Sequence, residues 1–365
     1  MSVTSVAVVM PSLSGGGVQR VLLNLGAEFL GRGMGVTVVV LGRTGSGATV
    51  PEGLEVIELQ EGGHLAKTRS LAALLDQREV DVAISGITRA NLSSLFAARF
   101  ARRRVRTVLT KHLPLDRLSS SPWRRYALRQ VIKTFYSRAD AVVAVSQGTL
   151  DSLEAAGVRP RRLLRIANPV IQRDLDDRMA GPVAHPWFEP GTPPVVLSAG
   201  RLTEQKGFDV LIRAFAELRG QREARLVILG EGELRQTLEG LATSLGVAAD
   251  VSLPGHASDA LPYMARAPVF ALSSRWEGLP TVLIEALAAG STVVAADCRV
   301  GPREILVGGE LGALVPVDDP AALARALARA LDEPKPVERS VLAEYMVGRA
   351  ADRYIELITE LVRDR

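Results

Sequence analysis

Short runs of β-branched and aliphatic residues alternate with stretches of helical periodicity along nearly the whole chain. Runs of four to eight apolar residues between helical stretches are typical of parallel strands covered by helices on both faces. The pattern predicts strands at residues 3–10, 36–41, 54–59, 81–85, 105–110 and 141–145, and at 195–199, 225–229, 251–253, 269–272, 292–296 and 313–315. We therefore expect an α/β fold with two doubly wound, Rossmann-like sheets.

A proline-rich stretch at 181–194 separates the two series of strands, because proline is excluded from helix interiors and central strands. We predict an N-terminal domain at 1–180, a linker at 181–194 and a C-terminal domain at 195–346. A C-terminal helix at 347–365 is expected to be able to pack back on the N-terminal domain. Two such domains are expected to face a central cleft, with ligands beyond the carboxyl ends of the strands.

Composition restricts the class of protein. With 47% hydrophobic and 23% charged residues in 365, the chain is too apolar for disorder and long enough for two domains. The single cysteine, Cys298, excludes an internal disulfide, and no histidine or cysteine cluster has zinc-like spacing. The first ten residues lack a basic leader, and no apolar run reaches the length of a membrane span. We expect a cytoplasmic protein without a bound metal.

Positive charge is concentrated in one segment. Residues 99–138 contain twelve Arg or Lys and one acid, Asp116, although the net charge of the chain is only +4. Within this segment, Trp123–Arg138 has the pattern of a helix with Arg125, Arg129 and Lys133 on one face and apolar side chains on another. Such a helix suits an anionic membrane surface, which would make the protein peripheral on the inner face of the cell membrane. A helix packed on the first domain with a solvated basic face is the alternative.

A glycine-rich turn follows the first predicted strand. Gly15, Gly16 and Gly17 lie directly before a helix that is expected to start near Val18. Glycines let the backbone approach a ligand closely, and the N-terminus of the helix favours an anion. A tight turn without a ligand explains the segment equally well, since it lacks the ending of a P-loop.

Two cations follow the first strand of the second series. Arg201 and Lys206 lie between Gly200 and Gly207. Two positive charges at one sheet edge repel each other unless an anion lies between them. A diphosphate fits this arrangement, and a solvated basic turn is the alternative.

A helix start follows the strand at 269–272. Pro280 suits the first turn of a helix, so the amides of Gly278, Leu279 and Thr281 are expected to point at an anion.

Two glutamates belong to the same stretch. Glu277 precedes the helix, and Glu285 lies inside it among apolar residues, where a carboxylate needs a hydrogen-bonding partner. Ribose hydroxyls would supply one, and a basic side chain from elsewhere in the fold is the alternative.

The seven residues between Glu277 and Glu285 resemble the E-x7-E signature of retaining GT-B glycosyltransferases, specifically of family GT4. Four further segments are similar to motifs of that family in the same order, and the resemblance covers the chain: residues 14–20, 200–207, 229–232 and 297–304. Gln19 departs from the pattern, because many members carry Glu there.

The resemblance implies transfer of a hexose or N-acetylhexosamine from a nucleotide diphosphate sugar, with UDP as the expected nucleotide. It implies that Arg201 and Lys206 neutralise the leaving diphosphate without a metal or other cofactor, and that Glu277 holds the donor sugar. His112 would lie near the transferred sugar, although Lys111 beside it could be the working residue instead. Front-face departure with retention needs no protein nucleophile. The implied donor-binding residues are Gly15, Gly16, Gly17, Gly200, Arg201, Lys206, Gly232, Glu277, Gly278, Leu279, Pro280, Thr281 and, at the ribose, Glu285.

The acceptor is not encoded in any motif, although a helix on anionic lipid would favour a lipid-linked saccharide of bacterial glycan assembly. Other GT-B enzymes, such as a sugar-nucleotide epimerase or a glycogen-synthase-like transferase, are the alternatives within the fold. A non-catalytic relative or a nucleic-acid-binding protein is the alternative from another class. Aromatic residues are only 4% of the chain and no binding module is recognised, so we expect no nucleic acid partner.

Overall fold

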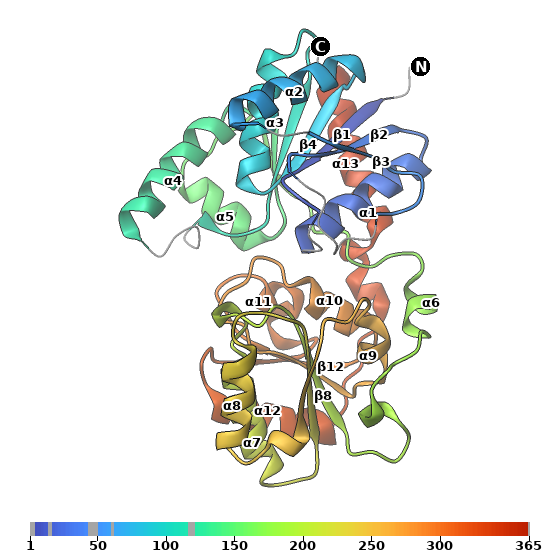
Figure 1. Cartoon of the computed structure of the whole chain (residues 1–365), viewed down its shortest axis with the longest axis vertical. Helices are drawn as coiled ribbons and strands as arrows, with labels where there is room; N and C mark the ends of the chain where they lie inside the picture. Colours follow the sequence, from blue (N-terminus) through green and yellow to red (C-terminus); the bar gives the residue numbers. More distant parts are fainter. Residues whose placement is uncertain (1–3, 14–16, 43–49, 60–61, 116–120, 364–365) are drawn as a thin grey trace. The chain divides into compact units, whose positions relative to one another are not determined.

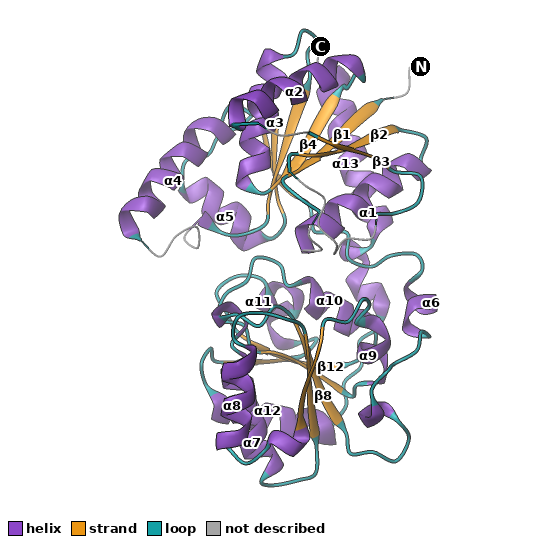
Figure 2. Ribbon diagram, in the orientation of Figure 1, coloured by secondary structure: helices purple, strands orange, loops and turns teal. Residues whose placement is uncertain are grey.

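The computed structural model of the chain describes residues 4–13, 17–42, 50–59, 62–115 and 121–363 (Figure 1). The chain divides into two compact units. The first unit consists of residues 1–170 and 344–365, and the second of residues 171–343. Each unit is an α/β body built on one parallel sheet (Figure 2). The predicted α/β class with two doubly wound sheets is therefore confirmed.

The sheet of the first unit has the strand order β3-β2-β1-β4-β5-β6-β7, and all described pairs are parallel. The chain order reverses between β1 and β4, which is where ligands bind in such sheets. β7 was not among the predicted strands, because its short sequence Arg-Leu-Leu-Arg carries charges at both ends and lies at the sheet edge. The strands are β1 (Ser5–Met10), β2 (Gly35–Val40), β3 (Glu55–Glu58), β4 (Val82–Gly86), β5 (Arg106–Lys111), β6 (Ala141–Ala144) and β7 (Arg162–Arg165).

Helices cover both faces of this sheet. Along β1, Val6 and Val8 pack with α1 and α13, whereas Ala7 and Val9 pack with α2 and α3. This is the alternation expected of a strand buried on both faces. The helices are α1 (Gly17–Gly31), α2 (His64–Gln77), α3 (Thr88–Phe100), α4 (Pro122–Tyr136), α5 (Gln147–Ala155) and α13 (Val347–Arg363).

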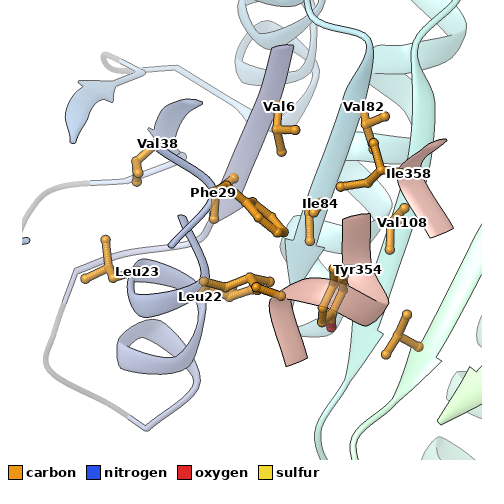
Figure 3. Packing of buried hydrophobic residues seen from close by; sticks show 14 of the residues in the cluster. Val6, Leu22, Leu23, Phe29, Val38, Val82, Ile84, Val108, Tyr354 and Ile358 are labelled. Atoms are coloured by element: carbon orange, nitrogen blue, oxygen red, sulfur yellow. The ribbon is translucent and has the colours of Figure 1, made fainter. Parts of the chain in front are cut away.

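The C-terminal helix α13 is part of the core of the first unit (Figure 3). The ring of its Tyr354 meets Phe29 of α1 edge to face, with centroids 6.3 Å apart. Ile358 packs in the same cluster as Ile84 of β4. Burying such a side chain stabilises a fold by about 1.5–3 kcal/mol, so α13 is an integral layer of this unit.

The sheet of the second unit has the order β10-β9-β8-β11-β12-β13 and reverses between β8 and β11. Its strands are β8 (Val195–Ala199), β9 (Arg225–Leu229), β10 (Val251–Gly255), β11 (Val269–Leu272), β12 (Thr292–Ala296) and β13 (Ala313–Val315). Its helices are α6 (Leu175–Met179), α7 (Phe208–Arg219), α8 (Arg235–Ser244), α9 (Leu261–Arg266), α10 (Thr281–Ala288), α11 (Pro302–Ile305) and α12 (Pro320–Asp332).

The boundaries of the units differ from the predicted domains. The chain passes from the first unit to the second between Val170 and Ile171 instead of near residue 180, and the proline-rich stretch belongs to the second unit. The reason is packing that proline content does not reveal. Phe188 meets Tyr263 edge to face at 5.3 Å, and the guanidinium of Arg225 lies over Trp187 at 5.0 Å. The chain returns to the first unit after Ala343, close to the predicted end of the C-terminal domain at 346.

Candidate functional site

Three loops of the second unit meet at the carboxyl ends of its central strands. They follow β8, β9 and β11, which are neighbours in the sheet. Glycines allow the close approach: a Cβ at Gly230 would overlap the carbonyl oxygen of Gly200, and one at Gly232 would overlap that of Leu202. Gly207 has a φ of 60° and lies against the carbonyl of Ser273 in the same way. Of these three glycines, Gly207 and Gly232 were named from the sequence, and Gly230 lies inside the segment 229–232.

Lys206 and Glu277 come from two of these loops and form an ion pair. The Nζ atom of Lys206 lies 2.7 Å from Oε1 of Glu277, which also accepts a hydrogen bond from the Ser274 hydroxyl at 2.7 Å. The Ser273 hydroxyl donates to the backbone oxygen of Lys206 at 2.8 Å. Glu277 is only 7% exposed, so the lysine charge compensates a carboxylate that is almost removed from water. Its Oε2 accepts no hydrogen bond from a described residue.

Arg201 lies on the same loop as Lys206 but in a different environment. Its side chain is exposed, and within the described part of the chain it has neither an ion pair nor a side-chain hydrogen bond. The two cations predicted to share an anion are therefore not equivalent, because Lys206 already has a carboxylate partner and Arg201 does not.

Helix α10 begins at Thr281, with Pro280 as the residue before it, and no side chain of the described residues caps its N-terminus. Its first amides are therefore available to an anion or to water. Gly278, Leu279 and Pro280 are buried under the loop after β12, since a Cβ at Gly301 would lie 2.7 Å from Cδ of Pro280.

Glu285 lies on α10 and is 6% exposed. Its charge acts on the guanidinium of Arg178, which forms a two-pronged pair with Asp259 at 2.8 and 3.0 Å. The sequence left two partners open for Glu285, ribose hydroxyls or a basic side chain. The structure supplies a basic neighbour, from α6, without assigning the ribose contact.

Two residues beside Glu277 were not selected from the sequence as site residues. Ser274 hydrogen-bonds its carboxylate, and Cys298 is buried next to it. Burial, with the negative charge of Glu277 as a smaller cause, raises the pKa of the Cys298 thiol to about 12. Cys298 is therefore a neutral packing residue. The position of Ser274 three residues before Glu277 was the available signal.

The glycine loop of the first unit lies largely outside the described residues, which exclude Gly15 and Gly16. Gly17 begins α1, and Gln19 in its first turn is buried with its amide 3.3 Å from the Ser12 hydroxyl. The structure therefore places one of the three predicted glycines, at the expected helix start.

His112 and Lys111 lie at the carboxyl end of β5. His112 Nε2 is 2.8 Å from the Thr110 hydroxyl, and its Nδ1 is buried with no partner among the described residues. Burial first, and then the charge of Lys111, lower the pKa of His112 to about 3. Lys111 is 5% exposed, and burial lowers its pKa to about 8. His112 is therefore neutral at physiological pH.

The basic segment forms α4, but its apolar stripe is divided. Ile132 and Tyr136 are fully buried in the first unit, and the Phe135 ring lies against Phe96 of α3 at 5.2 Å. At the other end of the helix, Trp123 is 72% and Tyr126 66% exposed. The second half of α4 is thus a packing helix, and only the first half presents an apolar surface.

No helix among the described residues is long and apolar enough to cross a bilayer. The same part of the chain contains no group of three His, Cys, Asp or Glu side chains that could hold a metal ion.

Comparison with known proteins agrees with this architecture. The sequence model of the family Glycosyltransferase Family 4 matches residues 15–172 of this chain, and that of the family Glycosyl transferases group 1 matches residues 185–346. A relative from Campylobacter jejuni is 28% identical over 257 residues, which are 70% of this chain and 68% of the relative. It is named N-acetylgalactosamine-N,N'-diacetylbacillosaminyl-diphospho-undecaprenol 4-alpha-N-acetylgalactosaminyltransferase.

Solved structures show the same fold along the whole chain. A glycosyltransferase from Rickettsia africae superposes with a TM-score of 0.82 over 100% of both chains, at 17% identity. An Anabaena protein in complex with UDP and glucose gives a TM-score of 0.77 at 21% identity, over 98% of this chain and 99% of that one. With two family models that follow one another along the chain, these likenesses identify the protein as a GT4-type glycosyltransferase with the GT-B fold.

Proposed function

We propose that this glycosyltransferase moves a hexose or N-acetylhexosamine from a UDP-sugar to a lipid-linked saccharide, with retention of anomeric configuration. The observation that carries the donor half is the pair of cations after β8, in which Arg201 has no carboxylate partner among the described residues and Lys206 lies against Glu277. An anion that binds in this loop can pair with Arg201 without displacing a carboxylate from it. The start of α10 adds uncapped amides at the same edge of the sheet.

Each charged group has a separate task in this proposal. Arg201 and Lys206 neutralise the diphosphate as its negative charge grows on departure, and they are held in place before the reaction. Glu277 keeps Lys206 oriented through Oε1 and offers Oε2, which has no hydrogen-bond partner in the described part of the chain, to a hydroxyl of the donor sugar. Glu285 accepts hydrogen bonds from the ribose.

We assign no protein nucleophile and no metal to the reaction. Retention follows if the leaving phosphate takes the proton of the attacking acceptor hydroxyl on the same face of the sugar, so that the acceptor bond forms where the phosphate bond breaks. The two cations supply the stabilisation that a divalent metal would otherwise give to the diphosphate. Undiminished transfer in excess EDTA is the expected result.

A UDP-linked donor and a lipid-linked acceptor are supported by what similar proteins bind or act on. The Anabaena structure contains UDP and glucose, and the name of the Campylobacter relative specifies a diphospho-undecaprenol saccharide. An acceptor of this kind requires the enzyme to work at a membrane surface.

The exposed part of α4 is suited to such a surface. Trp123 and Tyr126 project from the first half of the helix, and Phe100 at the end of α3 is 54% exposed. Arg99 and Arg124 are exposed beside these aromatic side chains in the sequence. Aromatic groups with neighbouring arginines favour the interface of an anionic bilayer. We propose that α3 and α4 hold the enzyme on the inner face of the cell membrane.

The test is a transfer assay with radiolabelled UDP-glucose, UDP-N-acetylglucosamine and UDP-N-acetylgalactosamine, each offered with undecaprenyl-diphosphate N-acetylglucosamine in anionic vesicles. The expected product is a lipid-extractable labelled disaccharide whose new linkage has the anomeric configuration of the donor, as read from its proton coupling constant. An inverted linkage would contradict retention. Transfer only to water-soluble sugars would contradict the lipid-linked acceptor.

A further inference from the structure

A chain of hydrogen bonds connects two neighbouring strands to the ring of His112. Oγ1 of Thr110 lies 2.9 Å from the backbone oxygen of Ser85 and 2.8 Å from Nε2 of His112. Thr110 is on β5 and Ser85 on β4, which pair in parallel. Both residues are fully buried, so water does not compete for these contacts.

The donors and acceptors of these hydrogen bonds have only one consistent arrangement. A carbonyl oxygen can only accept, and a threonine hydroxyl has a single proton. The Thr110 proton is therefore committed to the Ser85 oxygen. Oγ1 must then accept at its other contact, so the ring proton of His112 is on Nε2. A neutral imidazole has one ring proton, which leaves Nδ1 with a lone pair and no proton.

The free lone pair on Nδ1 is the unexplained feature of this arrangement. It is buried and has no partner among the described residues. An unsatisfied buried acceptor costs about 1–3 kcal/mol, so a native protein that keeps one has a reason to do so. A second proton on the ring is opposed by burial and by the adjacent Lys111 ammonium.

The space around the hydroxyl is also kept open. A Cβ at Gly86, on the strand beside Thr110, would lie 3.0 Å from Oγ1 of Thr110 and 2.9 Å from Cδ1 of Leu22. A side chain at position 86 would therefore push on the hydroxyl that holds His112. Thr110, Gly86 and the Ser85 carbonyl form one support for the ring.

We propose that Thr110 is a positioning residue that fixes His112 as the Nε2-protonated tautomer, so that Nδ1 accepts a hydrogen bond from a hydroxyl group of the sugar substrate. This inference rests on the proposed function and on the expectation from the sequence that His112 lies near the transferred sugar. Because Nδ1 is buried, the ring or its neighbours must shift when the sugar binds. A water molecule could donate the same hydrogen bond to Nδ1, and the experiment below separates water from the sugar hydroxyl.

The tautomer is read from the ring ¹⁵N signals of the full-length protein. The chain has four histidines, and a His112→Gln variant assigns the signal. His185 is the internal control, because its Nδ1 accepts from the backbone N–H of Trp187 at 3.2 Å and its Nε2 lies 3.0 Å from the Ser252 hydroxyl. Wild type and Thr110→Ser are expected to carry the His112 proton on Nε2. Thr110→Val should show both tautomers of His112, with His185 unchanged.

A proton on Nδ1 in the wild type, or an unchanged His112 tautomer in Thr110→Val, would overturn the role of Thr110. This measurement does not depend on glycosyl transfer, so it separates a failure of the inference from a failure of the proposed function.

The substrate contact is tested with UDP-glucose, UDP-N-acetylglucosamine and GDP-mannose. Each is first screened for whether it raises the melting temperature of the protein, and those that do are used. A stabilising nucleotide sugar should move the Nδ1 signal, whereas UDP or GDP alone should not. A nucleotide sugar that stabilises the protein and leaves Nδ1 unmoved contradicts the contact and indicates water. If none of the three stabilises, the proposed donor and the contact are both rejected, while the tautomer result stands.

In the transfer assay, Thr110→Val is expected to lower kcat/KM at least tenfold. Thr110→Ser, which keeps the hydroxyl, is expected to retain most of the wild-type kcat/KM. Equal losses in both variants would indicate that Thr110 serves packing alone.

Discussion

Lys206 and Glu277 are 71 positions apart in the sequence, and their side chains meet at 2.7 Å. One follows β8 and the other follows β11, so the pair joins two loops at the point where the strand order of the second sheet reverses. The pair therefore fixes the shape of the loop edge before any ligand arrives, and it also places a lysine charge where a diphosphate is expected.

The pair should make Lys206 important for folding as well as for donor binding. Removing one partner of a buried pair costs about 3–5 kcal/mol, and the partial exposure of Lys206 places this pair at or below the lower end. We expect Lys206→Ala and Glu277→Ala each to lower the free energy of unfolding by urea. The double variant should lose less than the two single losses added together. Strict additivity would show that the two charges do not interact.

Glu285 has two predicted partners, and one substitution separates them. Glu285→Gln keeps the shape of the side chain but removes the charge that accepts ribose hydroxyls and that acts on Arg178. We expect weaker UDP binding by isothermal titration with a melting temperature close to that of the wild type. Arg178→Gln is the matched control, because it removes the basic neighbour and leaves the carboxylate. A Glu285→Gln variant that unfolds easily but binds UDP with full affinity would assign Glu285 to a structural pair.

His112 predicts a pH dependence of stability. Its pKa is about 3 in the folded chain and about 6.5 when unfolded, so the unfolded chain binds more protons between these values. The contribution of His112 is fully present above pH 6.5 and is lost as the pH falls towards 3. The difference in unfolding free energy between wild type and His112→Gln should therefore shrink as the pH is lowered through this window. A constant difference would mean that His112 titrates normally in the fold.

The arrangement of strands and most of the site loops could be predicted from the sequence, because alternating apolar runs and glycine turns are local signals. β7 could not, since a four-residue edge strand with two arginines carries no such signal. The pairing of Lys206 with Glu277 and the Thr110 support of His112 depend on which strands are neighbours, and this is a long-range property. For the basic helix the sequence left two interpretations open, a helix on a membrane surface and a helix packed on the first domain, and the burial of Ile132 and Tyr136 supports packing of its second half.

The membrane prediction is accordingly narrowed to the exposed ends of α3 and α4. Arg129 donates to the backbone oxygen of Ala155, so Arg99 and Arg124 are better choices for substitution. We expect a variant with Arg99→Ser, Trp123→Ser and Arg124→Ser to sediment less with anionic vesicles than the wild type, and high salt to reduce the difference. Each basic residue near such a surface contributes about 1 kcal/mol.

The control carries Arg213→Ser and Arg325→Ser, two exposed arginines of the second unit. Equal sedimentation of the triple variant and the wild type would show that this surface is only solvated.

The central claim is that the loop after β8 binds the diphosphate of the donor, and the affinity for UDP tests it most directly. We would titrate UDP in EDTA into wild type, Arg201→Ala and the control Arg213→Ala, which removes an exposed arginine of α7. Hydrogen bonds to charged groups contribute about 1.5–3 kcal/mol, so Arg201→Ala should bind at least tenfold more weakly, while stability and the control remain unchanged. Wild-type affinity in Arg201→Ala would contradict the account.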